Sequence, residues 1–294
     1  MDDQPLRVID LITVAAEHMK SRGFENARLE VERLLGGVLG MSRIELYLAF
    51  DRLVDAKDRE AFRGLYRRRL AHEPLQHLVG ETEFREVRVK TDRRAFIPRP
   101  ETEILVEAAV EFLRGRDEPL IADLGTGAGV IALSVAYEVP GARAVAVDIS
   151  EDALLLAKAN ARKLGLEKAI TLVAGDMLDA LEGRGPFDAI LSNPPYVRSA
   201  EIDALELEVS LHEPRAALDG GPDGMTFHRR IAADAHCHLK PGGLLLLECG
   251  EDQAEPLRTC IEETNRYASI DIIRDLAGRE RVVKAIQGNL LQKP

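Results

Sequence analysis

Apolar positions in the N-terminal part of the chain have helical spacing. Between residues 6 and 70, apolar side chains recur every three or four positions, which is typical of amphipathic helices. Gly23, Gly40 and residues 51–58 interrupt this spacing and are expected to separate the helices, and Ser42 stands where it can cap one of them. The pattern predicts a small helical bundle.

The pattern changes to alternation after Pro74, which is expected to end the helical part. Between residues 84 and 89, apolar residues alternate with charged ones, and this predicts a short β-hairpin. We therefore expect residues 75–99 to form a hairpin linker. It would join an N-terminal helical domain over residues 1–74 to a second domain over residues 100–294.

In the second domain, short apolar runs alternate with stretches of helical spacing. Such alternation is typical of α/β proteins, in which helices connect the strands of a sheet. The runs that predict strands are residues 120–124, 144–147, 170–173, 189–191, 244–247, 270–273 and 281–286. We therefore expect an α/β fold here.

Composition and charge are those of an ordinary globular protein. Hydrophobic residues make up 46% and charged residues 30% of the 294 positions, which excludes disordered and fibrous classes. The net charge of −11 divides into +2 on residues 1–99 and −13 on residues 100–294. Because an acidic domain repels the phosphates of a nucleic-acid duplex, a protein or small-molecule partner is favoured.

The sequence carries no signal for a membrane, a secreted destination or a metal. No apolar run approaches the ~20 residues of a membrane span, and the first residues lack the features of a secretory signal. The three cysteines have no Cys-x-x-Cys spacing, so neither a disulfide framework nor a zinc site is indicated. We expect a cytoplasmic protein. The basic run at residues 67–69 is expected to be a solvated helix face rather than a binding patch.

A glycine-rich motif lies at the end of the first predicted strand and precedes a helix expected over residues 130–137. Its residues are Asp123, Leu124, Gly125, Thr126, Gly127, Ala128 and Gly129. Glycines allow the backbone to turn sharply and approach a ligand, and a helix N-terminus offers unpaired N–H groups. Taken alone, the turn is as compatible with a structural role as with nucleotide binding.

Acidic residues after the next two predicted strands indicate a nucleoside site. Asp148 ends the second strand and can accept hydrogen bonds from both hydroxyls of a ribose. Asp176 and Met177 follow the third strand, where the carboxylate can accept from an adenine amino group and the apolar side chain can cover the ring. Asp176 is equally compatible with a cap or turn. The Gly-x-Gly-x-Gly spacing departs from the dinucleotide pattern, so no pyrophosphate is required.

The most specific motif, Asn193-Pro194-Pro195-Tyr196, comes directly after the fourth predicted strand. Two consecutive prolines remove two backbone donors, which leaves carbonyls that can only accept, and Asn193 adds a carboxamide oxygen beside them. A planar NH₂ group is held by two acceptors in its plane. Tyr196 can close over such a flat group by stacking.

These motifs resemble those of class I S-adenosylmethionine-dependent methyltransferases that act on exocyclic or amide nitrogens. Residues 96–103, 212–218 and 239–243 further resemble the protein-glutamine N5-methyltransferases, in particular those that modify bacterial peptide chain release factors. The likeness covers roughly residues 75–284 and implies a Rossmann-like domain. The helical N-terminal region is similar in kind to that family's substrate-docking domain.

The resemblance implies a role for each cofactor-site residue. The turn from Gly125 to Gly129, with Thr126, Gly127 and Ala128 between them, would hold the methionine part of S-adenosylmethionine. Asp148 would take the ribose hydroxyls, and Asp176 with Met177 would lie by the adenine. Several relatives carry an aromatic residue in place of Met177.

The resemblance also implies the acceptor and its partners. Asn193, which also borders the cofactor, and the Pro194 carbonyl would hold the substrate glutamine amide, within a turn completed by Pro195 and flanked by Tyr196. The substrate would be the glutamine of the Gly-Gly-Gln motif in release factors, and the product N5-methylglutamine. A monomer that contacts neither nucleic acid nor membrane directly is expected.

Three other interpretations stay open. The first is methylation of a ribosomal-protein glutamine, and the second is methylation of an exocyclic amino group on a base. The acidic charge and the lack of basic stretches interleaved with aromatics weigh against a nucleic acid. The third is a module that binds the cofactor without catalysis. The intact acceptor motif weighs against it, because such a module does not need that motif. Arg99 and Glu213 could pair to support the acceptor loop or could each be a surface residue, and we expect a structural role for them.

Overall fold

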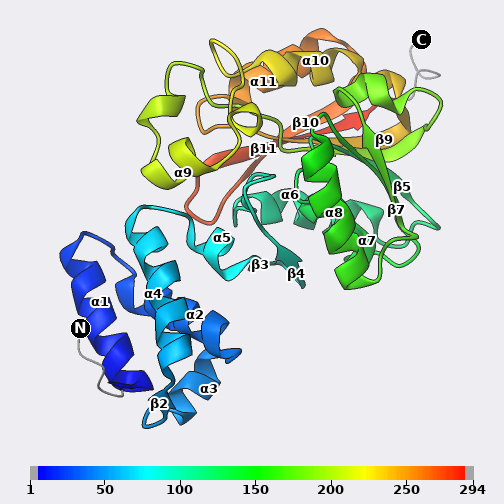
Figure 1. Ribbon diagram of the computed structural model, residues 1–294. Coiled ribbons are helices and arrows are strands. Elements are labelled where there is room, and N and C mark those ends of the chain that lie inside the picture. The colour runs from blue at the N-terminus through cyan, green and yellow to red at the C-terminus, as the bar shows by residue number, and fades with distance from the viewer. Residues whose placement is uncertain (1–5, 289–294) are drawn as a thin grey trace. The chain divides into compact units, whose positions relative to one another are not determined.

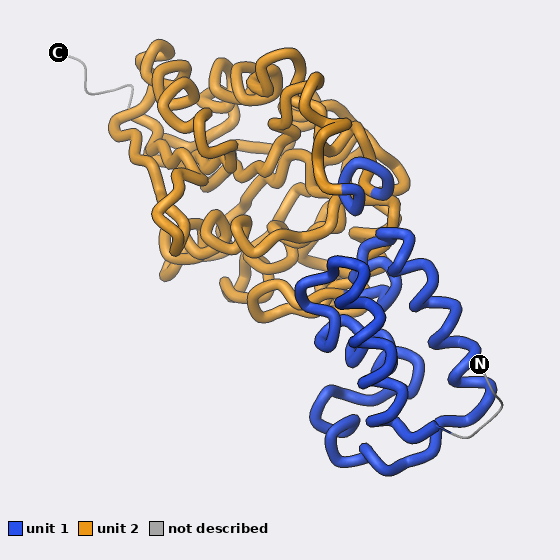
Figure 2. The backbone as a smooth tube through the Cα atoms, turned by 90° about the vertical axis from the view of Figure 1, so that its left-hand side faces the viewer, with its two compact units in different colours: residues 1–81, 207–212 blue, residues 82–206, 213–294 orange. Residues whose placement is uncertain are grey.

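The computed structural model describes residues 6–288, which form two compact units (Figure 2). The smaller unit contains residues 6–81 and 207–212, and the larger one contains residues 82–206 and 213–288. This grouping differs from the expected division at residues 74 and 99. Leu75 and Leu78 are buried in the core of the smaller unit, whereas Phe84 and Val87 of the hairpin are buried in the larger one.

The smaller unit is a helical bundle with one short strand pair. Its helices are α1 (Val8–Ser21), α2 (Ala27–Leu39), α3 (Arg43–Leu48), α4 (Ala56–Leu70), α5 (Leu75–Val79) and α9 (Leu207–His212) (Figure 1). The strands β1 (Leu6–Arg7) and β2 (Leu53–Val54) pair antiparallel. Apolar stripes of the longer helices meet in one core, in which Ile12, Leu35 and Phe62 are at most 3% exposed.

Two expectations about helix ends have different outcomes. Ser42 caps α3 as predicted, because its hydroxyl accepts from the Glu45 N–H at 3.3 Å while the Glu45 carboxylate accepts from the Ser42 N–H at 2.7 Å. The expectation that Pro74 ends the helical part is wrong, since Pro74 is the N-cap residue of α5. A proline is tolerated at a helix start because no intrahelical bond needs its missing N–H.

The basic run at residues 67–69 is only partly a solvated face. Arg67 is exposed, but the Arg69 side chain is 4% exposed and lies 4.7 Å from the ring centroid of Phe24. Its guanidinium donates to Glu30 and Glu208, each at 2.5 Å. The pattern on α4 alone could not reveal this burial, because one partner belongs to α9, far along the chain.

The larger unit is built on a seven-stranded sheet. Its strands are β5 (Leu120–Leu124), β6 (Arg143–Asp148), β7 (Ile170–Ala174), β8 (Phe187–Ser192), β9 (Leu239–Glu248), β10 (Tyr267–Arg274) and β11 (Glu280–Gln287). The order across the sheet is β10-β11-β9-β8-β5-β6-β7. The five strands from β9 to β7 are parallel, and β11 pairs antiparallel with both β9 and β10. All seven predicted strands are confirmed.

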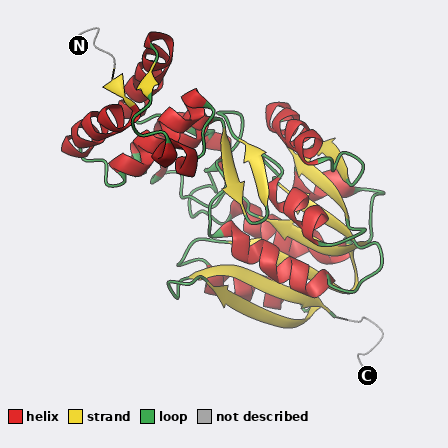
Figure 3. Cartoon of the chain, turned by 90° about the horizontal axis from the view of Figure 1, so that it is seen from below, coloured by secondary structure: helices red, strands yellow, loops and turns green. Residues whose placement is uncertain are grey.

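Helices cover both faces of this sheet (Figure 3). One face packs against α6 (Thr102–Leu113), α7 (Val130–Glu138), α8 (Glu151–Leu164) and the hairpin β3 (Glu81–Phe84) and β4 (Val87–Lys90). The other packs against α10 (Thr226–Asp234), α11 (Ala254–Glu263) and the 3₁₀ turn η1 (Met177–Leu181). The architecture is the expected Rossmann-like α/β sandwich, and it leaves the carboxyl ends of the parallel strands at one edge.

Three further 3₁₀ turns, η2 (Ile202–Ala204), η3 (Arg215–Ala217) and η4 (Ala235–Cys237), complete the described elements. Within residues 6–288, no helix combines the length and apolarity that a bilayer crossing requires.

We predict that Arg69→Ala lowers the free energy of unfolding of the smaller unit by about 3 kcal/mol, because it removes a buried cation and leaves the half-buried carboxylates of Glu30 and Glu208 without their partner. Urea unfolding followed by circular dichroism measures this loss. The matched control is Arg67→Ala, at an exposed position of the same helix, which should change the value by no more than about 0.5 kcal/mol. Equal losses in the two variants would contradict the assignment of Arg69.

Candidate active site

The predicted site residues gather at the carboxyl edge of the sheet. The glycine turn follows β5, Asp148 ends β6, Asp176 follows β7 and Asn193 follows β8. Because these strands are parallel neighbours, the four segments meet around one cavity of about 530 Å³. Its lining includes Gly125, Thr126, Gly127, Ala128, Asp148, Asp176, Met177, Asn193, Pro194, Pro195 and Tyr196.

Gly129 is the predicted residue that does not line the cavity. It caps the N-terminus of α7 with φ of +88°, and a Cβ there would lie 3.2 Å from the Cβ of Ala157. It therefore serves close packing of α7 against α8. Gly125 and Gly127 also have positive φ, +69° and +56°, which allows the turn to present backbone to the cavity.

Asp123 holds the glycine turn from beneath. Its Oδ2 accepts from the Thr126 hydroxyl at 2.5 Å and from the Ala132 N–H at 3.1 Å. The residue is fully buried, and within residues 6–288 no donor reaches Oδ1. Burial outweighs the two hydrogen bonds and raises the pKa of Asp123 to about 7.

Asp148 presents a partly satisfied carboxylate to the cavity. Its Oδ2 accepts from the Gly127 N–H at 2.8 Å, and its Oδ1 accepts from the Ser150 N–H at 2.9 Å. These bonds fix the plane of the carboxylate, while each oxygen keeps further acceptor capacity. Burial raises the pKa of Asp148 above its ordinary value. The arrangement suits a diol, which can donate one hydrogen bond to each oxygen.

Asp176 and Met177 lie at the rim of the same cavity. Arg230 donates to both oxygens of Asp176, at 3.2 and 2.9 Å, and the Asp176 side chain is 43% exposed. Arg230 was not predicted, because it lies on α10, far along the chain from the motifs. The methyl carbon of Met177 lies 3.8 Å from the position that a Cβ on Gly125 would take, so Met177 covers the glycine turn.

Asn193 and Pro194 form a pair of unused acceptors. The Asn193 Nδ2 donates to the Thr102 hydroxyl oxygen at 3.0 Å, which leaves its Oδ1 as the free end of the amide. Among residues 6–288, neither Asn193 Oδ1 nor the Pro194 carbonyl accepts a hydrogen bond. Because both residues line the cavity, they can together receive the two protons of one planar NH₂ group.

The segment after this pair is held by close backbone packing that the sequence motifs did not reveal. A Cβ on Gly220 would lie 2.7 Å from the Cα of Tyr196 and 2.8 Å from the Pro195 carbonyl oxygen. Gln253, 4% exposed, donates to the Tyr196 carbonyl at 2.9 Å. Gly220 also donates its N–H to the Val197 carbonyl at 2.8 Å. In the sequence, the only feature that marks this packing is the pair of adjacent glycines Gly220 and Gly221.

Arg99 and Glu213 do pair. The Arg99 guanidinium donates to Glu213 Oε1, and Glu213 Oε2 accepts from the Ile97 N–H at 3.0 Å. Arg99 also stacks 4.6 Å over the ring centroid of Phe96. The pair joins two segments that border the cavity, which gives it a supporting role.

Two further buried groups stand behind the acceptor pair. Glu248, at the end of β9, is 1% exposed, and burial raises its pKa to about 7 despite interactions with the hydroxyls of Thr102 and Tyr196. Burial also raises the pKa of Tyr196, so its phenol stays protonated. No cluster of three or more His, Cys, Asp or Glu that could hold a metal ion occurs in the described part of the chain.

Comparisons with known proteins show which family this chain belongs to. The PrmC N-terminal domain model matches residues 10–80, and the Methyltransferase small domain model matches residues 101–221. A Release factor glutamine methyltransferase from Rhodopirellula baltica is 40% identical over 96% of this chain and 97% of its own. One from Gloeobacter violaceus is 44% identical over 86% of this chain and 88% of its own.

Among solved structures, a 16S rRNA methyltransferase from T. thermophilus, in complex with AdoMet and guanosine, shares the fold. It has a TM-score of 0.51 and 21% identity, and the match covers 70% of this chain and 49% of that one.

We predict that Asp123→Asn removes a pH-dependent loss of stability. Since the pKa of Asp123 in the fold, about 7, lies above the 3.8 of an unperturbed carboxyl, this group favours the folded state at low pH and loses that contribution as pH rises through 7. The free energy of unfolding of the variant, relative to that of the wild type, should therefore increase as the pH rises from about 5 to about 8.

Chemical unfolding of the cofactor-free protein at both pH values measures this difference. Asp271→Asn, on an exposed strand position, is the control and should track the wild type. A constant offset between Asp123→Asn and the wild type would contradict the prediction.

We predict that Gly220→Ala displaces the acceptor segment, because the added methyl would overlap the Tyr196 backbone. Turnover should fall by about 10²-fold, as expected for misplacement of a reacting group by ~1 Å. Gly64→Ala, at a helical glycine with no atom within 4 Å of the added carbon, is the control and should leave turnover unchanged. Wild-type turnover in Gly220→Ala would contradict this account of the loop.

Proposed function

The chain belongs to the release factor glutamine methyltransferases, and we propose that it methylates the side-chain nitrogen N5 of the glutamine in the Gly-Gly-Gln motif of peptide chain release factors. It is an S-adenosylmethionine-dependent methyltransferase with a release factor as its substrate. The observation that carries the choice of acceptor atom is the pair of unused acceptors, Asn193 Oδ1 and the Pro194 carbonyl, on two residues that line the cavity.

The cavity residues fit the cofactor. A volume of about 530 Å³ is in the range of small-molecule sites, and the lining is mostly apolar with a few fixed polar groups. We propose that Asp148 accepts from the ribose hydroxyls, that Asp176 and Met177 lie by the adenine, and that the turn from Gly125 to Gly129 holds the methionine part. S-adenosylmethionine supplies an electrophilic methyl group on a sulfonium.

The acceptor pair accounts for catalysis at a weak nucleophile. An amide nitrogen reacts poorly because its lone pair is delocalised into the carbonyl, so the site must contribute orientation and electrostatic stabilisation. Asn193 Oδ1 and the Pro194 carbonyl would hold both amide protons in one plane. Positive charge develops on the nitrogen as the new bond forms, so these hydrogen bonds strengthen in the transition state. The surplus proton can leave afterwards, without a strong base at the site.

Tyr196 and Pro195 complete the proposed acceptor site. Tyr196 borders the cavity, and its protonated phenol adds no charge beside the substrate. We propose that its ring flanks the flat amide group. Pro195 removes a second backbone donor from the turn, so no N–H competes with the substrate for the acceptors.

The competing substrates are a ribosomal-protein glutamine and an exocyclic amino group on a base, since any planar NH₂ matches the same acceptors. The net charge of −13 on residues 100–294 opposes a nucleic acid. We propose a protein substrate, no direct contact with nucleic acid or membrane, and action as a monomer in the cytoplasm, where translation takes place. We further propose that the helical domain docks the substrate.

We predict that Asn193→Ala abolishes turnover while the affinity for S-adenosylmethionine stays within a few-fold, because the lost oxygen contacts the acceptor amide. Transfer of labelled methyl to purified release factor measures turnover, and calorimetry measures cofactor binding. Asn26→Ala, at an exposed position with no side-chain cap bond, is the matched control. Joint loss of turnover and cofactor binding would make Asn193 a cofactor or folding residue.

The same assay tests the substrate when it is run beside a release factor whose Gly-Gly-Gln glutamine is changed to alanine, a ribosomal protein and DNA. We expect label on the intact release factor alone. Label on the ribosomal protein or on DNA instead would overturn the proposed acceptor and leave the methyltransferase assignment in place.

A further inference from the structure

Asn160, on α8, joins the glycine turn to the β3–β4 hairpin. Its Oδ1 accepts from the Lys90 N–H at 2.7 Å. Its Nδ2 donates to the Lys90 carbonyl at 3.1 Å and to the Ala128 carbonyl at 2.9 Å. Lys90 is the last residue of β4, Ala128 belongs to the glycine turn, and Asn160 is fully buried. One side chain therefore connects two segments that lie far apart in the sequence.

The backbone groups allow this amide only one orientation. A backbone N–H can only donate and a carbonyl can only accept, so Oδ1 must face the Lys90 N–H and Nδ2 must face the two carbonyls. A half-turn of the amide would place its oxygen against both carbonyls and break all three hydrogen bonds. Such bonds are costly to lose in a buried place, because no water replaces the missing partner. Asn160 therefore fixes Lys90 and Ala128 relative to each other.

The hairpin leads directly into another part of the cavity lining, residues 91–99, which we call the wall segment. The lining includes five of its residues, Arg94, Ala95, Phe96, Pro98 and Arg99. The wall segment lies beside the glycine turn, since a Cβ on Gly127 would be 3.9 Å from the Cβ of Ala95. Glu213 holds the far end of this segment through Ile97 and Arg99. Asn160 holds the near end, at Lys90.

We propose that Asn160 is a positioning residue for the cofactor, which holds the glycine turn and the wall segment in the arrangement that S-adenosylmethionine binds. A site whose parts are already ordered loses less conformational entropy on binding, so affinity rises without a direct contact to the ligand. Asn160 acts from behind Ala128 and Lys90. The proposal rests on the proposed function, because it takes this cavity to be the cofactor site.

Asn160→Asp tests the proposal, because it keeps the shape of the side chain and the acceptor for Lys90 but removes both donors. The Kd for S-adenosylhomocysteine, measured by calorimetry, should rise about 10-fold, as expected when a buried polar group loses its partner. At saturating S-adenosylmethionine, kcat should stay within a few-fold of the wild type, since the acceptor pair is unchanged. The matched control is Asn265→Asp, at an exposed residue whose Nδ2 donates to the Glu263 carbonyl at 3.0 Å, and it should bind like the wild type.

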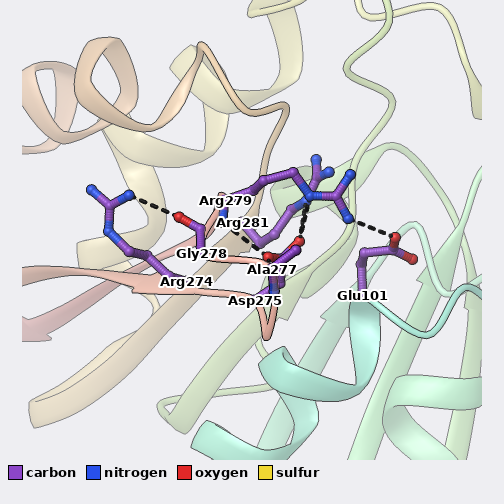
Figure 4. Close-up of polar contacts among 7 residues, drawn as sticks. All are labelled: Glu101, Arg274, Asp275, Ala277, Gly278, Arg279 and Arg281. Carbon is purple, nitrogen blue, oxygen red and sulfur yellow. Dashed lines mark hydrogen bonds and ion pairs between the residues drawn. The ribbon is translucent and has the colours of Figure 1, made fainter.

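Hydrogen exchange of backbone amides gives a second readout, which needs no turnover. In cofactor-free Asn160→Asp, the wall segment and the glycine turn should exchange faster than in the wild type. The turn between β10 and β11 is the internal reference, because Asp275 fixes it by accepting from the Ala277 and Arg279 N–H groups, each at 2.9 Å (Figure 4). The cavity lining includes none of the described residues 275–279, so exchange there should not change.

The wild type provides a test without any substitution. Saturating S-adenosylhomocysteine should slow exchange of the Lys90 N–H by a larger factor than exchange of the reference turn, because the cofactor orders the glycine turn and Asn160 transmits that order to Lys90. Equal factors would overturn the proposal. This measurement decides if Asn160→Asp fails to fold by circular dichroism.

The remaining outcomes separate the two levels of inference. Unchanged cofactor affinity in a folded Asn160→Asp variant would overturn the positioning role. Equal acceleration of exchange in the wall segment and the reference turn would also overturn it, because this indicates a general loss of stability. If the wild type does not bind S-adenosylhomocysteine, the proposed function fails, while exchange in the cofactor-free variant still decides whether Asn160 holds the wall segment.

Discussion

Parallel hydrogen bonding between β5 and its neighbours β6 and β8 is the constraint on which the site depends. The register pairs Leu124 with Val147 on one side and with Ser192 on the other, so the three strands end at the same level. Each strand passes directly into a segment that carries polar groups. The glycine turn, Asp148 and Asn193 therefore share one cavity although up to about seventy residues separate them along the chain.

The chemistry proposed for the site depends on acceptors that have no competing donors. Consecutive prolines remove two N–H groups beside Asn193, and the remaining backbone is held from behind by Gly220 and Gln253. An acceptor that is both rigid and unpaired costs little to reorganise when charge develops on a substrate nitrogen. Burial adds to this effect, since electrostatic interactions are stronger away from water.

Buried acids support the site without taking part in transfer. Asp123 orders the glycine turn through Thr126 and the start of α7, and Glu248 stands behind Thr102 and Tyr196. Burial raises the pKa of both carboxyls, because a charged carboxylate is poorly solvated inside the fold. In the smaller unit, Arg69 is the counterpart of this arrangement, a buried cation that two carboxylates neutralise.

The local patterns alone determined the elements and the motifs. Seven apolar runs became the seven strands, Ser42 became a cap, and the residues around Gly125, Asp148 and Asn193 were recognisable because glycine turns, strand-end acids and paired prolines act within a few positions. Only the tertiary structure decided the partners that come from distant segments. Arg69 pairs with Glu208, the acceptor segment packs on Gly220, and the Asn193 amide hydrogen-bonds to Thr102. No periodicity along the chain encodes these contacts, because they form only when the folded sheet and its helices bring separate segments within reach of one another.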